Sequence, residues 1–289
     1  MDNFMRLNRN KGIYVLVLLF AAVLWMQSVA GCSNGTAYDP SVEYSLAVQD
    51  ASNMTYDKIS RDLTAVVKEN KDLIWENGVA GSRVLVVAWV NESIGKSYKC
   101  PEEGCQPTDT CKEGKECPGY KWDTWVTVVP ELKNFFRGTA HDPLRIAQLL
   151  GLPPSDASKK VYMVEFWVSP DDLYRPCPDP EITDHECQVD FPADQFRMFD
   201  NTKTIYADQA CDLGQCGFKD YRGWFDNRRS YIYTSSNPYP WTGLGYTYDW
   251  GNPQNHRGLS EFVIHGSKEN GTRISVGMHS VKDTATYLQ

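Results

Sequence analysis

The sequence lacks the motifs of several common enzyme classes. It contains no G-x-S-x-G nucleophile elbow, no H-E-x-x-H helix and no glycine-rich phosphate loop, which argues against the usual serine hydrolases, zinc proteases and nucleotide-binding enzymes. It also has no basic patch longer than Arg228 and Arg229. Residues 32–289 carry 26 Lys and Arg against 36 Asp and Glu, a net charge of −10. A surface of that sign repels phosphate backbones, so we expect no nucleic-acid partner.

The apolar run at residues 13–26 is shorter than the roughly 20 residues of a membrane-spanning helix. It follows a short basic stretch and precedes small residues, which is the pattern of a secretory signal. Cys32 comes directly after Val29, Ala30 and Gly31 and resembles the cysteine of a bacterial lipobox, whose thiol is acylated. We expect residues 1–31 to be a lipoprotein signal peptide and Cys32 to be the lipidation site. Cleavage after Ala30 by an ordinary signal peptidase and an uncleaved anchor helix remain alternatives.

The cysteine count agrees with this prediction, because Cys32 accounts for the odd one of nine. An even remainder in an exported chain predicts a disulfide framework. We expect Cys177 to pair with Cys187 and Cys211 with Cys216. The other four lie in a polar insertion at residues 97–121 and are Cys100, Cys105, Cys111 and Cys117. Their gaps of four, five and five residues are longer than most zinc sites use, so we favour disulfides over zinc there and expect no metal and no cofactor.

We expect residues 32–52 to be an irregular tether and residues 53–289 a single domain. Apolar periodicity predicts helices at residues 56–75, 143–150 (ended by Gly151) and 220–229. Alternating or β-branched runs predict strands at residues 83–90, 124–129, 161–168, 245–250, 259–265 and 273–277. Because these strands follow one another without long crossovers, the predicted fold class is α+β, with an antiparallel or mixed sheet, a few short helices and disulfide-stapled loops.

Aromatic residues are concentrated at residues 221–250, which hold ten in thirty positions against 12% in the whole chain. Tyr239, Trp241 and Tyr246 are the candidate binding residues there, because their rings offer flat faces to sugars or peptides. Packing of these rings into a core is the alternative.

Glu261 and His265 are the candidate catalytic pair. In a strand, residues four apart point to the same face, and Asp249 would be a third polar group nearby. Such groups in an aromatic cleft could act as general acid and base. The alternative is a structural Glu261, paired with Arg257 or a backbone donor. The acidic loop at residues 179–186 could bind calcium, but it lacks the spacing of an EF-hand, and we favour a solvated loop.

Two segments, PWTGLGYTYDWG at residues 240–251 and GLSEFVI at residues 258–264, resemble the shared core of an uncharacterised family of bacterial exported proteins. The segments at residues 125–136 and 175–182 resemble it as well. The resemblance implies that residues 125–265 form one unit, and it supplies no activity.

Two functions are consistent with these features. The first is a non-enzymatic lipoprotein of the cell envelope, held to the membrane by the lipid on Cys32 and binding a protein or glycan through residues 221–250. Ser33 is typical of lipoproteins sent to an outer membrane, if the source is Gram-negative. The second is a periplasmic or surface hydrolase or transferase that uses Glu261 with Asp249 or His265. An exported toxin is disfavoured, because the lipid would retain the protein at the cell.

Overall fold

The computed structural model describes residues 38–99, 116–118, 123–139, 142–192, 221–264 and 274–289. Residues 40–289 form one compact unit. This unit combines helices with antiparallel sheets and a disulfide-closed loop, which confirms the predicted α+β class. Cys32 lies outside the described residues.

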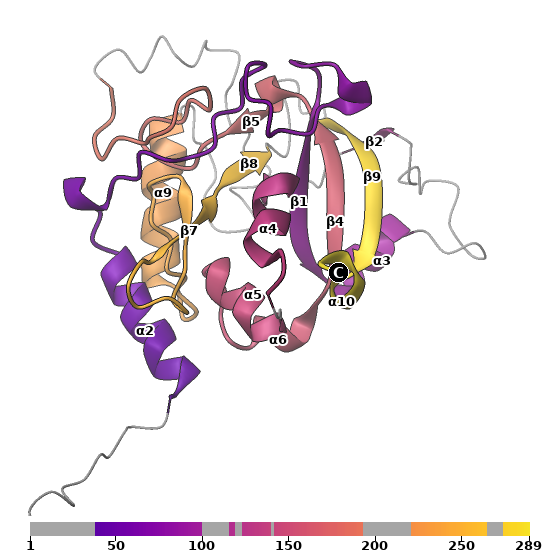
Figure 1. The fold of residues 1–289 in the computed structure, drawn as a ribbon. Coiled ribbons are helices and arrows are strands. Elements are labelled where there is room, and N and C mark those ends of the chain that lie inside the picture. Colours follow the sequence, from indigo (N-terminus) through magenta and orange to yellow (C-terminus); the bar gives the residue numbers. More distant parts are fainter. Residues whose placement is uncertain (1–37, 100–115, 119–122, 140–141, 193–220, 265–273) are drawn as a thin grey trace, which may run out of the picture. The chain divides into compact units, whose positions relative to one another are not determined.

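A seven-stranded antiparallel sheet forms the centre of the unit, in the order β2-β9-β4-β1-β3-β8-β5 (Figure 1). Its strands are β1 (Val84–Asn91), β2 (Glu116–Pro118), β3 (Thr124–Val128), β4 (Lys160–Val168), β5 (Leu173–Tyr174), β8 (Phe262–Ile264) and β9 (Ser275–Asp283). A second sheet pairs β6 (Tyr246–Tyr248) with β7 (Arg257–Ser260). The predicted strand at residues 259–265 is therefore divided between two sheets, and Glu261 lies at the division.

Strands β1 and β4 are nearly continuous apolar runs, so most of their residues are buried whichever face they point to. The first face carries Val86 of β1 and Phe166 of β4, and α3 (Glu92–Lys99) packs against it through Tyr98. The second face carries Val87 of β1 and Met163 of β4.

Two groups of helices cover the second face. One group consists of α4 (Val129–Phe136), α5 (Pro143–Leu149), α6 (Asp156–Lys159) and α10 (Thr284–Tyr287). The other cover is α9 (Tyr221–Thr234), whose Trp224 and Phe225 pack with Val263 of β8. Figure 1 shows α4 and α5 in front of the sheet and α9 beside them. The second face of the sheet is thus covered in one part by α4, α5, α6 and α10 and in another part by α9.

Two sequence predictions are wrong in the first part of the chain. Residues 56–75 do not form a helix: only a short 3-10 turn, η1 (Tyr56–Lys58), is present, and a second, η2 (Glu76–Gly78), follows. Instead the backbone N–H groups of Leu63 and Val66 donate to the carbonyls of His185 and Ile182, which draws the segment into an extended path. Residues 40–51 of the expected irregular tether form helix α2 (Pro40–Ala51).

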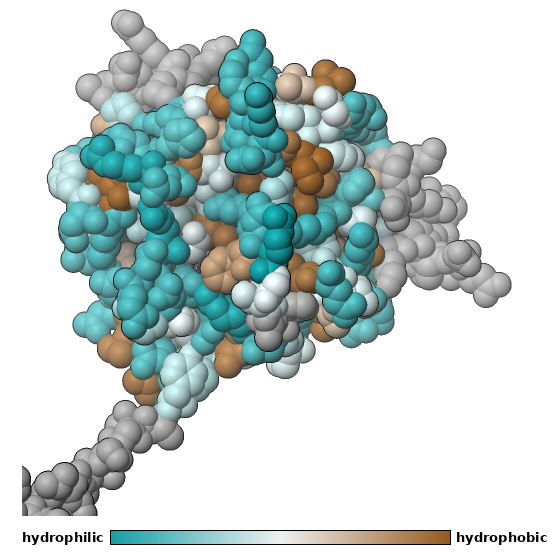
Figure 2. Space-filling view, viewed as in Figure 1, coloured by the Kyte–Doolittle hydropathy of each residue, from teal (hydrophilic) through white to brown (hydrophobic). Residues whose placement is uncertain are grey.

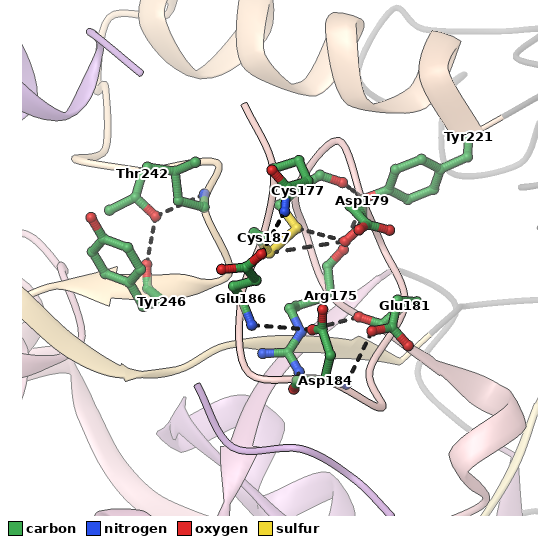
Figure 3. The surroundings of a disulfide bond; sticks show 12 residues. Arg175, Cys177, Asp179, Glu181, Asp184, Glu186, Cys187, Tyr221, Thr242 and Tyr246 are labelled. Atoms are coloured by element: carbon green, nitrogen blue, oxygen red, sulfur yellow. Dashed lines mark hydrogen bonds between the residues drawn. A yellow bond between two sulfur atoms is a disulfide. The ribbon is translucent and has the colours of Figure 1, made fainter. Parts of the chain in front are cut away.

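The disulfide between Cys177 and Cys187 is present as predicted. The short turn η3 (Pro170–Asp172) leads into β5, and the disulfide closes the loop that follows β5. The fully buried Arg175 lies inside this loop and donates to the carbonyls of Glu181 and Asp184 (Figure 3). The acidic loop therefore surrounds a buried cation. The sequence analysis favoured a solvated loop and did not anticipate this role.

The predicted pair of Cys211 with Cys216 lies outside the described residues. So do Cys100, Cys105 and Cys111, whereas Cys117 belongs to β2. In the parts of the chain that the structure describes, no helix has the length and apolar character needed to cross a membrane. The face seen in Figure 2 is largely hydrophilic, with hydrophobic residues in small separate groups.

Candidate functional site

A cavity of about 450 Å³ lies on the second face of the sheet, between the two helical covers. Its sheet side is formed by Val87 and Trp89 of β1, Trp125 and Thr127 of β3, and Met163 of β4. Thr127 is paired directly with Val87 in the sheet, so both side chains point to this face. The cavity exists because α4–α6 and α9 each cover part of the sheet and leave a space between them.

The loop between α9 and β6 supplies Tyr239 and Trp241 to the aromatic wall of the cavity, and β6 supplies Tyr246. Trp241 packs edge-to-face against Trp125, with ring centroids 5.7 Å apart. The hydroxyl of Tyr246 donates to the carbonyl of Lys58, so its polar end is already bonded. The three residues chosen from composition thus line one cavity; their role in binding stays a prediction.

Gly245 brings the aromatic wall close to the disulfide loop. Its φ of 75° is a backbone conformation that glycine adopts without strain. A Cβ atom at this position would lie 2.6 Å from the Sγ atom of Cys187 and 2.8 Å from Cδ of Arg175. The carbonyl of Gly245 accepts a hydrogen bond of 2.9 Å from the backbone N–H of Glu261. The tight turn therefore holds Glu261 in place beside the aromatic wall.

Glu261 is the carboxyl group of the cavity that has no ion-pair or hydrogen-bond partner for its buried Oε2 atom among the described residues. Burial raises the pKa of this side chain from its usual 4.5 to about 8, and the nearby indole N–H of Trp241 offsets part of the increase. Arg257, the alternative partner considered from the sequence, instead binds Ser60 and Asp62. At neutral pH the Glu261 side chain is therefore mainly a neutral acid.

Two other residues of the cavity wall have a buried side-chain atom without a hydrogen-bond partner among the described residues, Oγ1 of Thr127 and Nε of Arg228. The indole N–H of Trp241 interacts with the Glu261 carboxyl group. Most buried polar groups in proteins are hydrogen-bonded, and an unpaired one costs about 1–3 kcal/mol. These atoms are closed off from solvent, so each is a local cost to the stability of the fold.

Two cations contribute to the cavity wall. The ammonium group of Lys160 donates to the carbonyl of Trp89 at 2.9 Å and lies 3.9 Å from Asp156. Burial lowers the pKa of Lys160. Arg228 lies 3.4 Å from the carboxylate of Asp123. Each cation thus has a carboxylate partner.

The structure does not bring Asp249 to this cavity. Both of its carboxylate oxygens bind the guanidinium of Arg145 on α5, at 2.7 and 2.6 Å, and the side chain is 1% exposed. The expectation that Asp249 and Glu261 share a cleft is therefore wrong. His265 lies outside the described residues.

Sequence reasoning missed Thr127, Lys160 and Arg228. The alternation of TWVTV could have placed Trp125 and Thr127 on one face of β3, but nothing in the sequence indicated that α9 would bring Arg228 to the same face. Among the described residues that line the cavity there is no serine, cysteine or histidine. Within the described parts of the chain, no group of three His, Cys, Asp or Glu side chains could hold a metal ion.

The arrangement is that of an apolar, aromatic space with a few polar groups, which is typical of small-molecule sites. Its volume falls in the usual range of about 300–1,000 Å³ for such pockets. Comparisons with protein-family models, with curated proteins and with solved structures found no match for this chain.

Proposed function

We propose that this chain is an exported lipoprotein, anchored through a lipid on Cys32, whose domain binds a small molecule in the aromatic cavity. The observation that carries the binding function is a space of about 450 Å³ between the two helical covers, lined by aromatic and apolar side chains with a few polar groups. The disulfide between Cys177 and Cys187 supports export, because such bonds persist in oxidising compartments.

The proposed membership of the exported family is supported by the position of its two main segments. Residues 240–251 contain β6 and residues 258–264 contain most of β7 and all of β8. Tyr246 of the first segment pairs with Ser260 of the second, and both segments contribute to the cavity wall. We propose no activity from this resemblance.

A hydrolase or transferase that uses Glu261 has less support. Asp249 is held by Arg145, and the described residues of the cavity lining offer no second carboxyl group free of an ion pair. A lone acid can bind a ligand, whereas acid–base catalysis of hydrolysis usually needs a second group that activates water.

The binding proposal can be tested with three probes that share a naphthalene ring and differ in the head group: 2-acetylnaphthalene, 2-naphthoate and 2-naphthylmethylammonium. Equilibrium dialysis of the full chain in non-ionic detergent, with protein-free micelles as the blank, measures binding. We expect at least one probe to bind, and Tyr239→Ala to weaken it at least fivefold, because loss of a ring contact costs about 1 kcal/mol.

Tyr56→Ala is the matched control. Tyr56 is 68% exposed and outside the cavity, whereas Tyr239 is 39% exposed and in its wall. The control should bind the probes like the wild type. Binding of no probe, or equal loss in both variants, would refute the proposed site.

A further inference from the structure

One primary amine belongs to the wall of the cavity. Among the described residues that line this space, Lys160 is the only lysine, and it stands at the start of β4, directly after α6. Its side chain is 22% exposed, whereas those of Lys68 and Lys96 are 71% and 63% exposed. Lys160 is thus a partly enclosed amine beside an aromatic space, unlike these lysines of the open surface.

The amine of Lys160 has two acceptors around it. It donates to the backbone carbonyl of Trp89 at 2.9 Å, and the carboxylate of Asp156 is 3.9 Å away, beyond hydrogen-bonding distance. Trp89 and Asp156 line the same cavity. The amine is therefore oriented by a neutral carbonyl and faces a carboxylate without being locked into a close ion pair.

This setting favours the uncharged form of the amine, which is the nucleophilic one. Burial lowers the pKa of Lys160, and the charge of Asp156 opposes the change. An ordinary lysine is uncharged in only about one of 2,500 molecules at pH 7, and each unit by which the pKa falls raises that share about tenfold. Desolvation in an apolar pocket is one of the ways in which proteins activate a lysine toward carbonyl compounds.

We infer that the cavity takes up an aromatic aldehyde and that its carbonyl carbon forms an imine with the amine of Lys160. This inference rests on the proposed binding function and adds a covalent step to it. The lone pair of the nitrogen attacks the carbonyl carbon, and the second carbon–oxygen bond breaks. The oxygen receives the two amine protons in turn and leaves as water, while the nitrogen forms a double bond to the carbon. The step consumes no oxidant or reductant.

The surroundings of Lys160 suit each stage of this reaction. The carboxylate of Asp156 is within reach, through one water molecule, of the protons that pass from nitrogen to oxygen. A protonated imine keeps one N–H, which can donate to the carbonyl of Trp89, and its charge takes the place of the ammonium charge opposite Asp156. The aromatic and apolar lining, including Tyr239 and Met163, suits the ring of the aldehyde.

The test uses 2-naphthaldehyde, which has the ring of the other probes, together with sodium cyanoborohydride, which reduces an imine to a stable amine. The full chain in non-ionic detergent is treated at pH 7, digested and mapped by mass spectrometry. Lys159 is the internal reference, because it is the exposed neighbour of Lys160 and does not line the cavity. We expect at least about tenfold more naphthylmethyl adduct on Lys160 than on Lys159.

Three variants complete the experiment, each checked for folding by its melting temperature. Lys160→Arg keeps a cation and a donor for Trp89 but forms no imine, so the excess adduct should disappear. Lys159→Arg is the matched control and should leave the labelling of Lys160 unchanged. Tyr239→Ala should reduce labelling of Lys160 at least about threefold, because the ring of the aldehyde is held less well.

Two results would overturn the imine. One is equal labelling of Lys159 and Lys160 in the wild type, and the other is labelling of Lys160 that Tyr239→Ala leaves unchanged. Binding of 2-acetylnaphthalene in dialysis shows in either case that the binding site stands without the covalent step. Failure of 2-naphthaldehyde to label Lys160, together with no binding of the three earlier probes, refutes the site as well.

Discussion

Glu261 links the cavity to the stability of the whole fold. Its pKa is about 8 in the folded protein and near 4.5 when the chain is unfolded. Between these values the folded state keeps a proton that the unfolded state releases. The free energy of unfolding therefore falls as the pH rises across this interval, by about 1.4 kcal/mol per unit at most, and the contribution is fully present only below pH 4.5.

Glu261→Gln should remove this component. The stability of the variant relative to the wild type should increase steadily from pH 5 to pH 8, as measured by urea unfolding at each pH. Glu43→Gln is a suitable control, because Glu43 is exposed on α2 and its replacement should leave the pH profile unchanged. A constant difference between Glu261→Gln and the wild type over this range would contradict the raised pKa.

Asp249 has a structural role that can be separated from the cavity. Its bidentate pair with Arg145 joins the turn after β6 to α5. Asp249→Asn should lower the free energy of unfolding by about 2 kcal/mol, because hydrogen bonds to a charged group are lost. Binding of the naphthalene probes should be unchanged. The control is Asp226→Asn, which removes an exposed ion pair within a helix and should change the free energy of unfolding by less than about 0.5 kcal/mol. Loss of probe binding in Asp249→Asn but not in the control would show that Asp249 takes part in binding.

At the scale of elements, the disulfide loop is a separate unit built around a buried charge. Arg175 is enclosed by the loop, and its guanidinium also lies over the ring of Phe262, 5.4 Å from its centroid. Burial lowers the pKa of this guanidinium, and the nearby acids of the loop oppose the change. Because the carbonyls that bind Arg175 belong to the loop, the disulfide keeps those acceptors in position.

Replacing both cysteines, Cys177→Ala with Cys187→Ala, should lower the free energy of unfolding by about 3 kcal/mol. The bond joins residues ten apart, and a loop of that size restricts the unfolded chain by about this amount. Urea unfolding of the full chain measures the change. A loss below about 1 kcal/mol would show that packing alone holds the loop around Arg175.

The strands could be predicted from the sequence better than the helices. A buried strand such as β1 can be recognised from its own residues, because it is a run rich in valine and leucine. Helix α2 buries only Ala47 and Ala51, so it has no apolar periodicity to detect. The segment at residues 56–75 has that periodicity, but its backbone pairs with the disulfide loop more than a hundred residues away, a contact that no local pattern encodes.

The candidate site was partly predictable for the same reason. The aromatic wall could be found from composition, and Glu261 from its place among strand residues. The partners of these residues could not. Arg145 reaches Asp249 across 104 positions of the chain, and the break between β7 and β8 at Glu261 depends on which sheet each strand joins. Sequence patterns indicate which residues are unusual; packing decides which of them meet.

At the scale of the whole molecule, the proposed lipid on Cys32 determines where the cavity would operate. A domain tethered in this way would meet its ligand at a membrane surface outside the cytoplasm, and the net charge of −10 for residues 32–289 would favour its solubility there. The proposed tether depends on the thiol of Cys32 alone, so it can be tested independently of the cavity.

Cys32→Ala should release the protein from the membrane fraction, because no acyl chain can then be attached at this position. Fractionation of cells that express the full chain measures release, and mass spectrometry of the wild type should show the added acyl mass. Ser33→Ala is the control, since it alters the neighbouring residue and keeps the acceptor thiol. A single chain gives only weak membrane binding and several chains give a stable anchor, so complete retention of the wild type together with complete release of Cys32→Ala is the expected pair of results. Membrane retention of Cys32→Ala, with no acyl mass on the wild type, would favour an uncleaved anchor helix and end the lipoprotein proposal.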